Sequence, residues 1–166
     1  MSHIGRRLAG SHRKDYVTWS NSYSMGIKEI DDQHKGLLGF VNDLHNHATG
    51  NEKEEREYFK EVIQQAVEYV KTHFATEENY MVAAKFPGYT EHKREHDLFV
   101  RTIVKTVNDY QAGKRLTLTY LARFLKDWIL SHVAVEDVQY ARYFRSIATR
   151  KADGKLSITN ADIKLL

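Results

Sequence analysis

The sequence predicts an all-α protein: an up-down-up-down antiparallel four-helix bundle with an extended N-terminal arm. Its 166 residues include a single proline, Pro87, so long helices can run without interruption. Four segments repeat their apolar residues at the helical period of about 3.6 residues. The connections between these segments are short, which favours antiparallel neighbours in a bundle.

The first predicted helix covers about 31–47, with Asp31 as its N-cap. Gly50 indicates a turn after it. The second helix covers about 52–84 and ends before Pro87. The inward positions are Leu37, Leu38, Val41 and Leu44 in the first helix, and Val62, Ala66, Tyr69, Val70, His73, Glu77 and Met81 in the second.

The third predicted helix covers about 89–111 and stops at Gly113, a residue typical of helix C-termini. The fourth begins at Thr117, which we expect to be its N-cap, and continues to about Phe144. The inward positions are His92, His96, Phe99, Val100, Ile103, Val107 and Tyr110 in the third helix, and Leu121, Leu125, Trp128, His132 and Val135 in the fourth.

We expect three regions along the chain. They are a basic N-terminal extension (1–14), the helical bundle (15–147) and a polar C-terminal extension (148–166). Within the bundle region, residues 15–30 predict an extended arm. Three apolar residues are expected to pack this arm onto the helices: Trp19, Tyr23 and Ile27.

Composition excludes several classes of protein. The chain has no cysteine, which rules out disulfides, thiolate metal sites and cysteine nucleophiles. Its apolar stretches are too short to span a membrane, and its basic start lacks the apolar segment of a secretory signal. We therefore expect a cytoplasmic protein with no membrane partner.

The net charge of +3 does not indicate nucleic-acid binding. Residues 1–14 carry four basic groups and no acid, whereas residues 15–144 carry 16 basic and 20 acidic residues. A nucleic-acid-binding domain would show its positive charge on the folded part of the chain. We therefore expect no nucleic-acid partner.

Five histidines and two carboxylates lie at helical spacings on the apolar faces of the predicted helices. Residues four apart share one helix face, so the H-x-x-x-E and H-x-x-x-H patterns each direct two side chains the same way. A buried imidazole or carboxylate is costly unless something pairs with it, and a metal cluster would pair with all seven. The seven candidates are His34, His73, Glu77, His92, His96, His132 and Asp137.

The residue types narrow the choice of metal. Imidazole and carboxylate without thiolate favour iron, zinc, manganese or copper, and seven ligands are too many for one tetrahedral zinc ion. Two metals that each take about six ligands could use five imidazoles, two bridging carboxylates and a bridging oxide or hydroxide. This set leaves one coordination position open, which suits a small diatomic ligand.

The spacing of His132 and Asp137 needs its own explanation. Residues five apart on a regular α-helix lie about 140° apart around the axis. Either Asp137 reaches sideways toward a metal, or the helix widens locally into a π-turn, a feature common at functional sites. The sequence leaves both alternatives open.

The order of these motifs resembles the hemerythrin family, in its bacterial branch. The order is a single His, then H-x-x-x-E, H-x-x-x-H and H-x-x-x-x-D, and the resemblance covers about residues 15–144. The residues that carry it, besides the candidate ligands, are Trp19, Gly26-Ile27, Ile30-Asp31-Asp32-Gln33 before His34, Lys35, Phe74, Pro87-Gly88-Tyr89, Lys93-Arg94-Glu95 and Trp128.

The resemblance implies a four-helix bundle with a non-heme di-iron centre that binds O2 reversibly. Its cofactor would be two Fe ions, Fe2+ or Fe3+, bridged by oxide or hydroxide, with no heme. The residues implied are His92, His96 and His132 for the coordinatively full iron, His34 and His73 for the open iron, Glu77 and Asp137 as bridges, and Leu37, Phe74, Trp128 and Val135 in the oxygen pocket.

Each candidate also has an ordinary structural alternative. A single core histidine is more often hydrogen-bonded than metal-bound, but seven candidates in family order favour a metal site. Glu77 and Asp137 could be surface charges, as we expect Glu78 and Glu136 to be, yet their spacing from a histidine argues otherwise. Two tyrosines could donate hydrogen bonds to the ligands: Tyr80 and Tyr140.

The sequence supports three functional hypotheses, of which we favour the first. It is an oxygen carrier, store or sensor without enzymatic activity, whose ligand is O2, with nitric oxide, azide or peroxide as alternatives at the same position. The second is a di-iron oxidoreductase acting on peroxide, nitric oxide or O2. Oxygen-activating bundles use a Glu-x-x-His pattern with more carboxylates, which this chain lacks. The third is an oxygen-sensing module of a larger signalling protein, for which only the basic ends argue.

Overall fold

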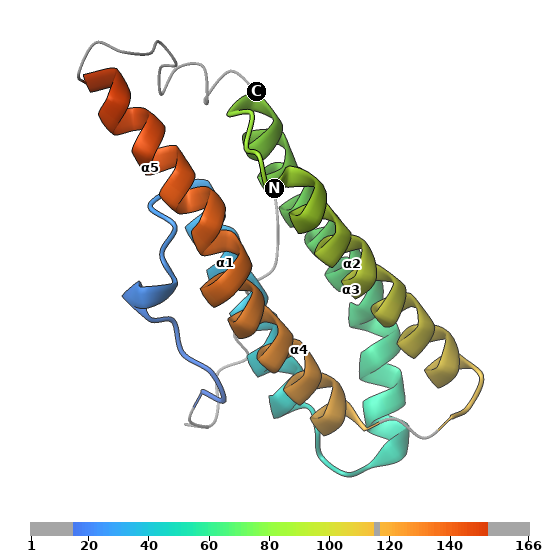
Figure 1. Ribbon diagram of the computed structural model, residues 1–166. Helices are drawn as coiled ribbons and strands as arrows, with labels where there is room; N and C mark the ends of the chain where they lie inside the picture. The colour runs from blue at the N-terminus through green and yellow to red at the C-terminus, as the bar shows by residue number, and fades with distance from the viewer. Residues whose placement is uncertain (1–14, 115–116, 153–166) are drawn as a thin grey trace.

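Four long helices form a bundle in the computed structural model, which describes residues 15–114 and 117–152 (Figure 1). The first three helices are single elements, whereas the fourth consists of two α-helices joined by a π-helical turn, η2. No β-strand occurs among these residues, and the predicted all-α bundle is confirmed. The elements are α1 (Lys28–Asn46), α2 (Glu52–Ala83), α3 (Tyr89–Gln111), α4 (Leu118–His132), η2 (Val133–Asp137) and α5 (Val138–Ala152).

An extended arm precedes α1, as predicted. It contains one short 3-10 turn, η1 (Asn21–Tyr23), and runs beside the bundle (Figure 1). Asn42 of α1 holds its start: the Asn42 amide donates to the Val17 carbonyl oxygen (2.8 Å), and Asn42 Oδ1 accepts from the Val17 N–H (2.9 Å). The three predicted packing residues contact the core: Trp19, Tyr23 and Ile27.

α1 begins three residues earlier than predicted, and the prediction that Asp31 is its N-cap was wrong. The Asp31 carboxylate lies inside the helix and accepts hydrogen bonds from the Met25 N–H (2.7 Å) and the Ser24 hydroxyl (2.5 Å). These bonds tie the arm to the helix, and Ile27 takes the cap position without a side-chain hydrogen bond. The carboxylate near the N-terminus also suits the positive end of the helix dipole.

The other helix ends largely agree with the sequence. Asn51 caps α2 and Thr117 caps α4, each through a side-chain oxygen that accepts backbone N–H groups of the first turn. Gly113, just past α3, has a φ of +83°, which costs glycine little. The fourth helix runs past the predicted end at Phe144. It crosses the expected boundary at 147, and the predicted extensions at 1–14 and 153–166 lie outside the described residues.

The π-helical turn η2 decides between the two alternatives for His132 and Asp137. In a π-turn each hydrogen bond spans five residues rather than four, so His132 and Asp137 lie about one turn apart on the same face. The same widening turns Val135 outward, and 54% of its surface is exposed. The prediction that Val135 faces the core was therefore wrong, because it assumed a regular α-helix.

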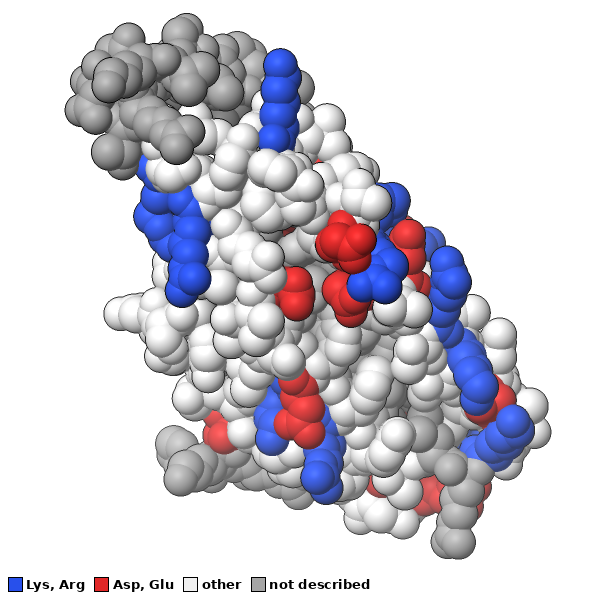
Figure 2. All heavy atoms as spheres, in the orientation of Figure 1, with Lys and Arg blue, Asp and Glu red and all other residues white. Residues whose placement is uncertain are grey.

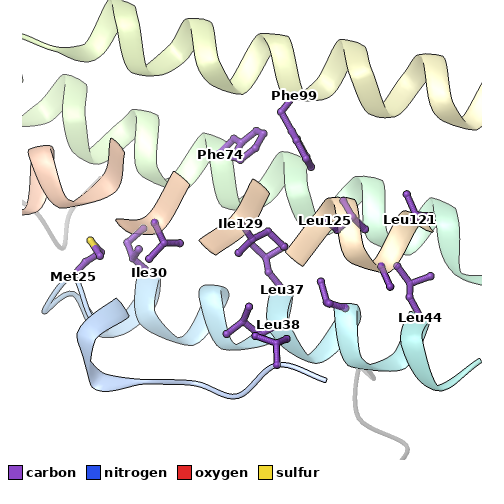
Figure 3. Close-up of a cluster of buried hydrophobic side chains, with 14 of the residues drawn as sticks. Met25, Ile30, Leu37, Leu38, Leu44, Phe74, Phe99, Leu121, Leu125 and Ile129 are labelled. Atoms are coloured by element: carbon purple, nitrogen blue, oxygen red, sulfur yellow. The ribbon is translucent and has the colours of Figure 1, made fainter. Parts of the chain in front are cut away.

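The helices enclose one shared interior. α1 packs against α4 and α2, and α2 packs against α3. Figure 3 shows the buried rings of Phe74 and Phe99, from α2 and α3, on one side of this interior, with Leu37 of α1 and Leu125 and Ile129 of α4 on the other. Side chains from four helices can therefore meet at one point.

The surface of the described part of the chain carries mixed charges. On the face shown in Figure 2, Lys and Arg side chains alternate with Asp and Glu side chains, without one extended positive patch on the described residues. None of the described helices is long and apolar enough to cross a membrane. The expected absence of nucleic-acid and membrane partners stays a prediction.

Candidate metal centre

All seven predicted ligands converge inside the bundle. Each is buried, with an exposed fraction of 5% or less. They come from every long helix and from the π-turn: His34 on α1, His73 and Glu77 on α2, His92 and His96 on α3, His132 on α4, and Asp137 in η2.

Three of the histidines form what we call the three-histidine group: His92, His96 and His132. The Nε2 atom of His96 lies 3.1 Å from the Nε2 atoms of both His92 and His132. One ligand atom from each histidine and one from Glu77 all lie within 4.8 Å of one another. Ring nitrogens directed at a single point suit a shared cation, because only one nitrogen of a contacting pair can carry a proton toward the other.

The remaining two histidines form the two-histidine group: His34 and His73. Their ring centroids lie 4.9 Å apart. His34, His73 and Glu77 each offer one ligand atom, and these three atoms also lie within 4.8 Å of one another. This group therefore resembles the first but has one imidazole fewer.

The Glu77 carboxylate lies between the two groups and turns one oxygen to each. Its Oε1 lies 3.5 Å from His34 Nε2 and 3.6 Å from His73 Nε2. Its Oε2 lies 3.1 Å from His96 Nε2 and 3.8 Å from His92 Nε2. A carboxylate in this position can bridge two cations.

Asp137 repeats the arrangement from the opposite helix. Its Oδ2 lies 3.2 Å from His34 Nε2, in the two-histidine group. Its Oδ1 lies 3.2 Å from His132 Nε2 and 3.4 Å from His92 Nε2, in the three-histidine group. The π-turn is what brings this oxygen pair inward, so the unusual local helix has a direct consequence for the site.

Several buried polar atoms of the site lack a hydrogen-bond partner among the described residues. They are both ring nitrogens of His34, Oε2 of Glu77 and both carboxylate oxygens of Asp137. These atoms lie close to one another but not in hydrogen-bonding geometry, and unpaired buried polar atoms are costly. A pair of cations would satisfy them, and an imidazole and carboxylate donor set fits iron. The residues present therefore fit a di-iron cofactor.

The ionisation of the site also favours cation binding. Burial lowers the pKa of His73 to about 4, so its ring is neutral at pH 7. Burial raises the pKa of Glu77, but His73 and the other histidines outweigh it and hold that pKa well below its usual value. Burial lowers the pKa of His34, yet Asp137 and Glu77 raise it to about 9. Neutral imidazole and ionised carboxylate are the forms that bind metal, so His34 must release a proton on loading.

Two residues hold the outer nitrogens of the histidines. Gln33 Oε1 lies 3.0 Å from His73 Nδ1, and Glu78 Oε1 lies 3.1 Å from His96 Nδ1. Such contacts fix the orientation of a ligating ring. The expectation that Glu78 is a surface charge was wrong, because only 19% of its side chain is exposed. Both residues directly adjoin a candidate ligand in the sequence, which is the signal that could have revealed them.

Of the two tyrosines considered from the sequence, one reaches the site. The fully buried Tyr140 hydroxyl donates to Glu77 Oε1 at 2.8 Å. Burial and the Glu77 charge raise the pKa of Tyr140 well above its usual value, so the hydroxyl stays protonated. Tyr80 donates instead to Glu29 (2.8 Å).

Three of the four predicted pocket residues line an apolar cavity beside the site: Leu37, Phe74 and Trp128. The ring of Phe74 stacks on His96 with centroids 3.7 Å apart, and that of Trp128 stacks on His132 at 4.5 Å. Val135 is exposed and does not line the cavity, for the reason given above.

Comparison with known proteins agrees with the resemblance seen in the sequence. Residues 25–144, which include all seven candidate ligands, match the family model described as the hemerythrin HHE cation binding domain. A bacteriohemerythrin of Stenotrophomonas maltophilia is 32% identical over 125 residues, 75% of this chain and 79% of the relative. One of Methylococcus capsulatus is 30% identical over 126 residues, 75% of this chain and 93% of the relative.

The fold agrees with the same family. A crystal structure of wild-type hemerythrin superposes with a TM-score of 0.67 at 30% sequence identity. The match covers 76% of this chain and 96% of that chain. The structural match and the sequence match thus point to the same family.

Proposed function

The chain belongs to the hemerythrin family, and from that premise we propose that it binds dioxygen reversibly at a non-heme di-iron centre. The observation that carries the proposal is the position of the two buried carboxylates. Glu77 and Asp137 each turn one oxygen to the three-histidine group and the other to the two-histidine group. This arrangement supports two metal ions rather than one.

The proposed ligand sets differ by one imidazole, so one iron would have a coordination position free for a ligand. A bound iron pair would supply that position and the electrons that dioxygen binding requires. The proposed ligands are His92, His96 and His132 for one iron, His34 and His73 for the other, and Glu77 and Asp137 as bridges.

The surrounding side chains favour reversible binding. Leu37, Phe74 and Trp128 give the site an apolar wall that keeps water and protons away from a bound ligand. Tyr140 holds Glu77 in place through its buried hydroxyl. Excluding water slows loss of the bound ligand as a charged, reduced species, so release as dioxygen is favoured.

The donor set supports binding over catalysis. Bundles that activate oxygen use four carboxylates, two of them in Glu-x-x-His patterns, whereas this site has five histidines and two carboxylates. We propose a carrier, store or sensor, and nitric oxide, azide or peroxide would occupy the same position. Steady-state turnover of peroxide or nitric oxide with a reductant would favour the di-iron oxidoreductase instead.

Anaerobic reduction followed by exposure to air tests the proposal. The protein is reconstituted with excess ferrous salt, assayed for iron, and followed by visible spectroscopy through cycles of oxygenation and deoxygenation. We expect about two irons per chain and a charge-transfer band that appears with oxygen and disappears on its removal. A single iron per chain, or a spectrum that does not reverse, would contradict the proposal.

A further inference from the structure

An apolar cavity of about 200 Å³ extends from the candidate metal centre toward the end of the bundle that holds the α1–α2 and α3–α4 connections. All four long helices contribute to its wall. Figure 3 shows part of that wall, with Phe74 and Phe99 facing Leu37 and Leu125. Representative wall residues nearer the connections are Leu44, Phe59, Ile103 and Leu121.

The wall of the cavity is almost entirely apolar. Its polar groups are the Lys71 ammonium, the Thr106 hydroxyl and the Trp128 indole N–H. The Lys71 side chain is 60% exposed and its ammonium pairs with Glu68 (3.1 Å), and the Thr106 hydroxyl donates to the Thr102 carbonyl oxygen (2.9 Å). The indole N–H alone is fewer than the two to four hydrogen-bond partners that buried water needs, so the cavity favours apolar contents.

A void of this size is unusual in a protein interior. Interiors are normally close-packed, and atoms that line a void lose dispersion contacts on one side. A ligand of matching shape restores those contacts. A dry cavity of about 150 Å³ with aliphatic and aromatic walls is large enough for benzene, so this one is large enough as well.

The cavity reaches the surface. Val104 of α3 is part of its wall, and half of the Val104 surface is exposed. Lys71 of α2, also part of the wall, is exposed as well. A small molecule can therefore enter past these side chains without unfolding of the bundle.

We propose that this cavity is a binding site for one small uncharged apolar molecule, the size of benzene or a short hydrocarbon, separate from the oxygen position. Leu37, Phe74 and Trp128 border both the cavity and the candidate metal centre, so the two ligands would lie side by side. None of the seven candidate metal ligands is part of the wall, so this site does not depend on the metal.

Calorimetric titration with benzene tests the site, on the protein as purified and after iron loading. We expect saturable binding of one benzene per chain in both forms. Phenol should bind at least about tenfold more weakly, because the Trp128 N–H alone cannot replace the hydrogen bonds that its hydroxyl makes in water. Absence of saturable benzene binding, or equal affinity for phenol, would overturn the proposal.

A pair of variants on one helix turn locates the site. Ala66 belongs to the cavity wall, so Ala66→Phe fills the void and should lower benzene affinity at least about tenfold, with a smaller loss for Ala66→Leu. Gln65 is exposed, and Gln65→Phe adds the same ring outside and should leave the affinity unchanged. If Ala66→Phe fails to fold, Ala66→Leu carries the comparison. Equal benzene affinity in the Ala66 and Gln65 variants would place binding elsewhere and refute the assignment.

Discussion

The two histidine groups of the metal centre differ in ligand number and in their surroundings. In the three-histidine group, Phe74 stacks on His96 and Trp128 stacks on His132, so aromatic rings fix two imidazoles. In the two-histidine group, both ring nitrogens of His34 lack a hydrogen-bond partner among the described residues. The comparison teaches that the two groups differ by one histidine, supplied by the H-x-x-x-H pattern of α3, and in our proposal this difference leaves one metal position open.

The largest effect is expected where the two groups join. Glu77→Gln keeps the shape of the side chain but removes the charge that faces both groups, so both metals should be lost to a chelator that leaves the wild-type protein loaded. Metal content per chain measures this. Glu55→Gln is the matched control, because Glu55 is also buried on α2 but accepts from the Gly50 and Leu118 N–H groups, away from the site. Retention of both metals in Glu77→Gln would remove the case for a bridge.

Removal of a ligand from one group should empty that metal position and leave the other one occupied. His73→Ala is expected to lower the metal content from about two ions per chain to about one, because the three-histidine group keeps all its nitrogens. The oxygen-dependent absorption band should disappear with the second ion. His45→Ala is the control, since His45 lies on α1 and stacks on Tyr16 outside the site. A variant that keeps both ions would show that His73 is not a ligand.

Much of this site could be predicted because it repeats the period of the helix. Residues three or four apart share a face whatever the rest of the fold does, so the pairs His73/Glu77 and His92/His96 follow from spacing alone. His34 and His132 follow from their apolar neighbours, whereas the position of Asp137 does not follow from a regular helix. The helix ends predicted at Gly113 and Thr117 are equally local, because a cap depends on its own turn.

The features that sequence reasoning missed depend on contacts between segments. Asp31 lies inside α1 rather than at its cap because the arm folds back to it. Glu78 and Gln33 adjoin candidate ligands in the sequence, but the rings that they contact lie on neighbouring helices, so the packing of the helices decides these partners. The π-turn is one of the two alternatives that the sequence left open, and it directs Asp137 inward and Val135 outward.

The residues that contact the outer ring nitrogens, Gln33 and Glu78, allow the metal affinity of each group to be changed on its own. Loss of such a partner costs about 10–100-fold in metal affinity. Glu78→Ala should therefore lower the metal affinity of the three-histidine group, and Gln33→Ala should lower that of the two-histidine group. Competition with a chelator measures both affinities. Glu136→Ala should have little effect, because Glu136 adjoins Asp137 but hydrogen-bonds Gln139. If both variants weakened the same ion, the assignment of the groups would be wrong.

The apolar wall should control the lifetime of the oxygenated form. Trp128→Ala opens the wall beside His132, and Leu37→Asn places a polar group in that wall, three residues after His34. Because both changes would let water approach the bound ligand, both should speed autoxidation. We expect about a tenfold increase for Trp128→Ala, which corresponds to a barrier lowered by about 1.4 kcal/mol. Decay of the oxygenated band measures the rate. Phe124→Ala is the control, since Phe124 stacks on Phe99 without contacting a candidate ligand. Unchanged lifetimes in both wall variants would mean that water exclusion does not govern reversibility.

The last expected effect is on stability and concerns His34 and His73 in the metal-free protein, whose pKa values shift in opposite directions. The His34 pKa rises from 6.5 to about 9, so its stabilisation is complete below pH 6.5 and is lost as the pH rises through about 9. The His73 pKa falls from 6.5 to about 4, so its neutral form adds stability above pH 6.5 that is lost as the pH falls through about 4. Urea unfolding of the metal-free protein should therefore show greatest stability near pH 6.5.

Two comparisons sharpen this last prediction. Loading with metal should abolish the alkaline decline, because a cation then replaces the His34 proton beside Glu77 and Asp137. His34→Gln should abolish it in the metal-free protein too, while the acidic decline due to His73 remains. A free energy of unfolding that stays constant between pH 6.5 and 9 without metal would show that His34 is not protonated there. Any difference between His34 and His73, the imidazoles of the two-histidine group, would then have to come from ligand geometry and not from protonation.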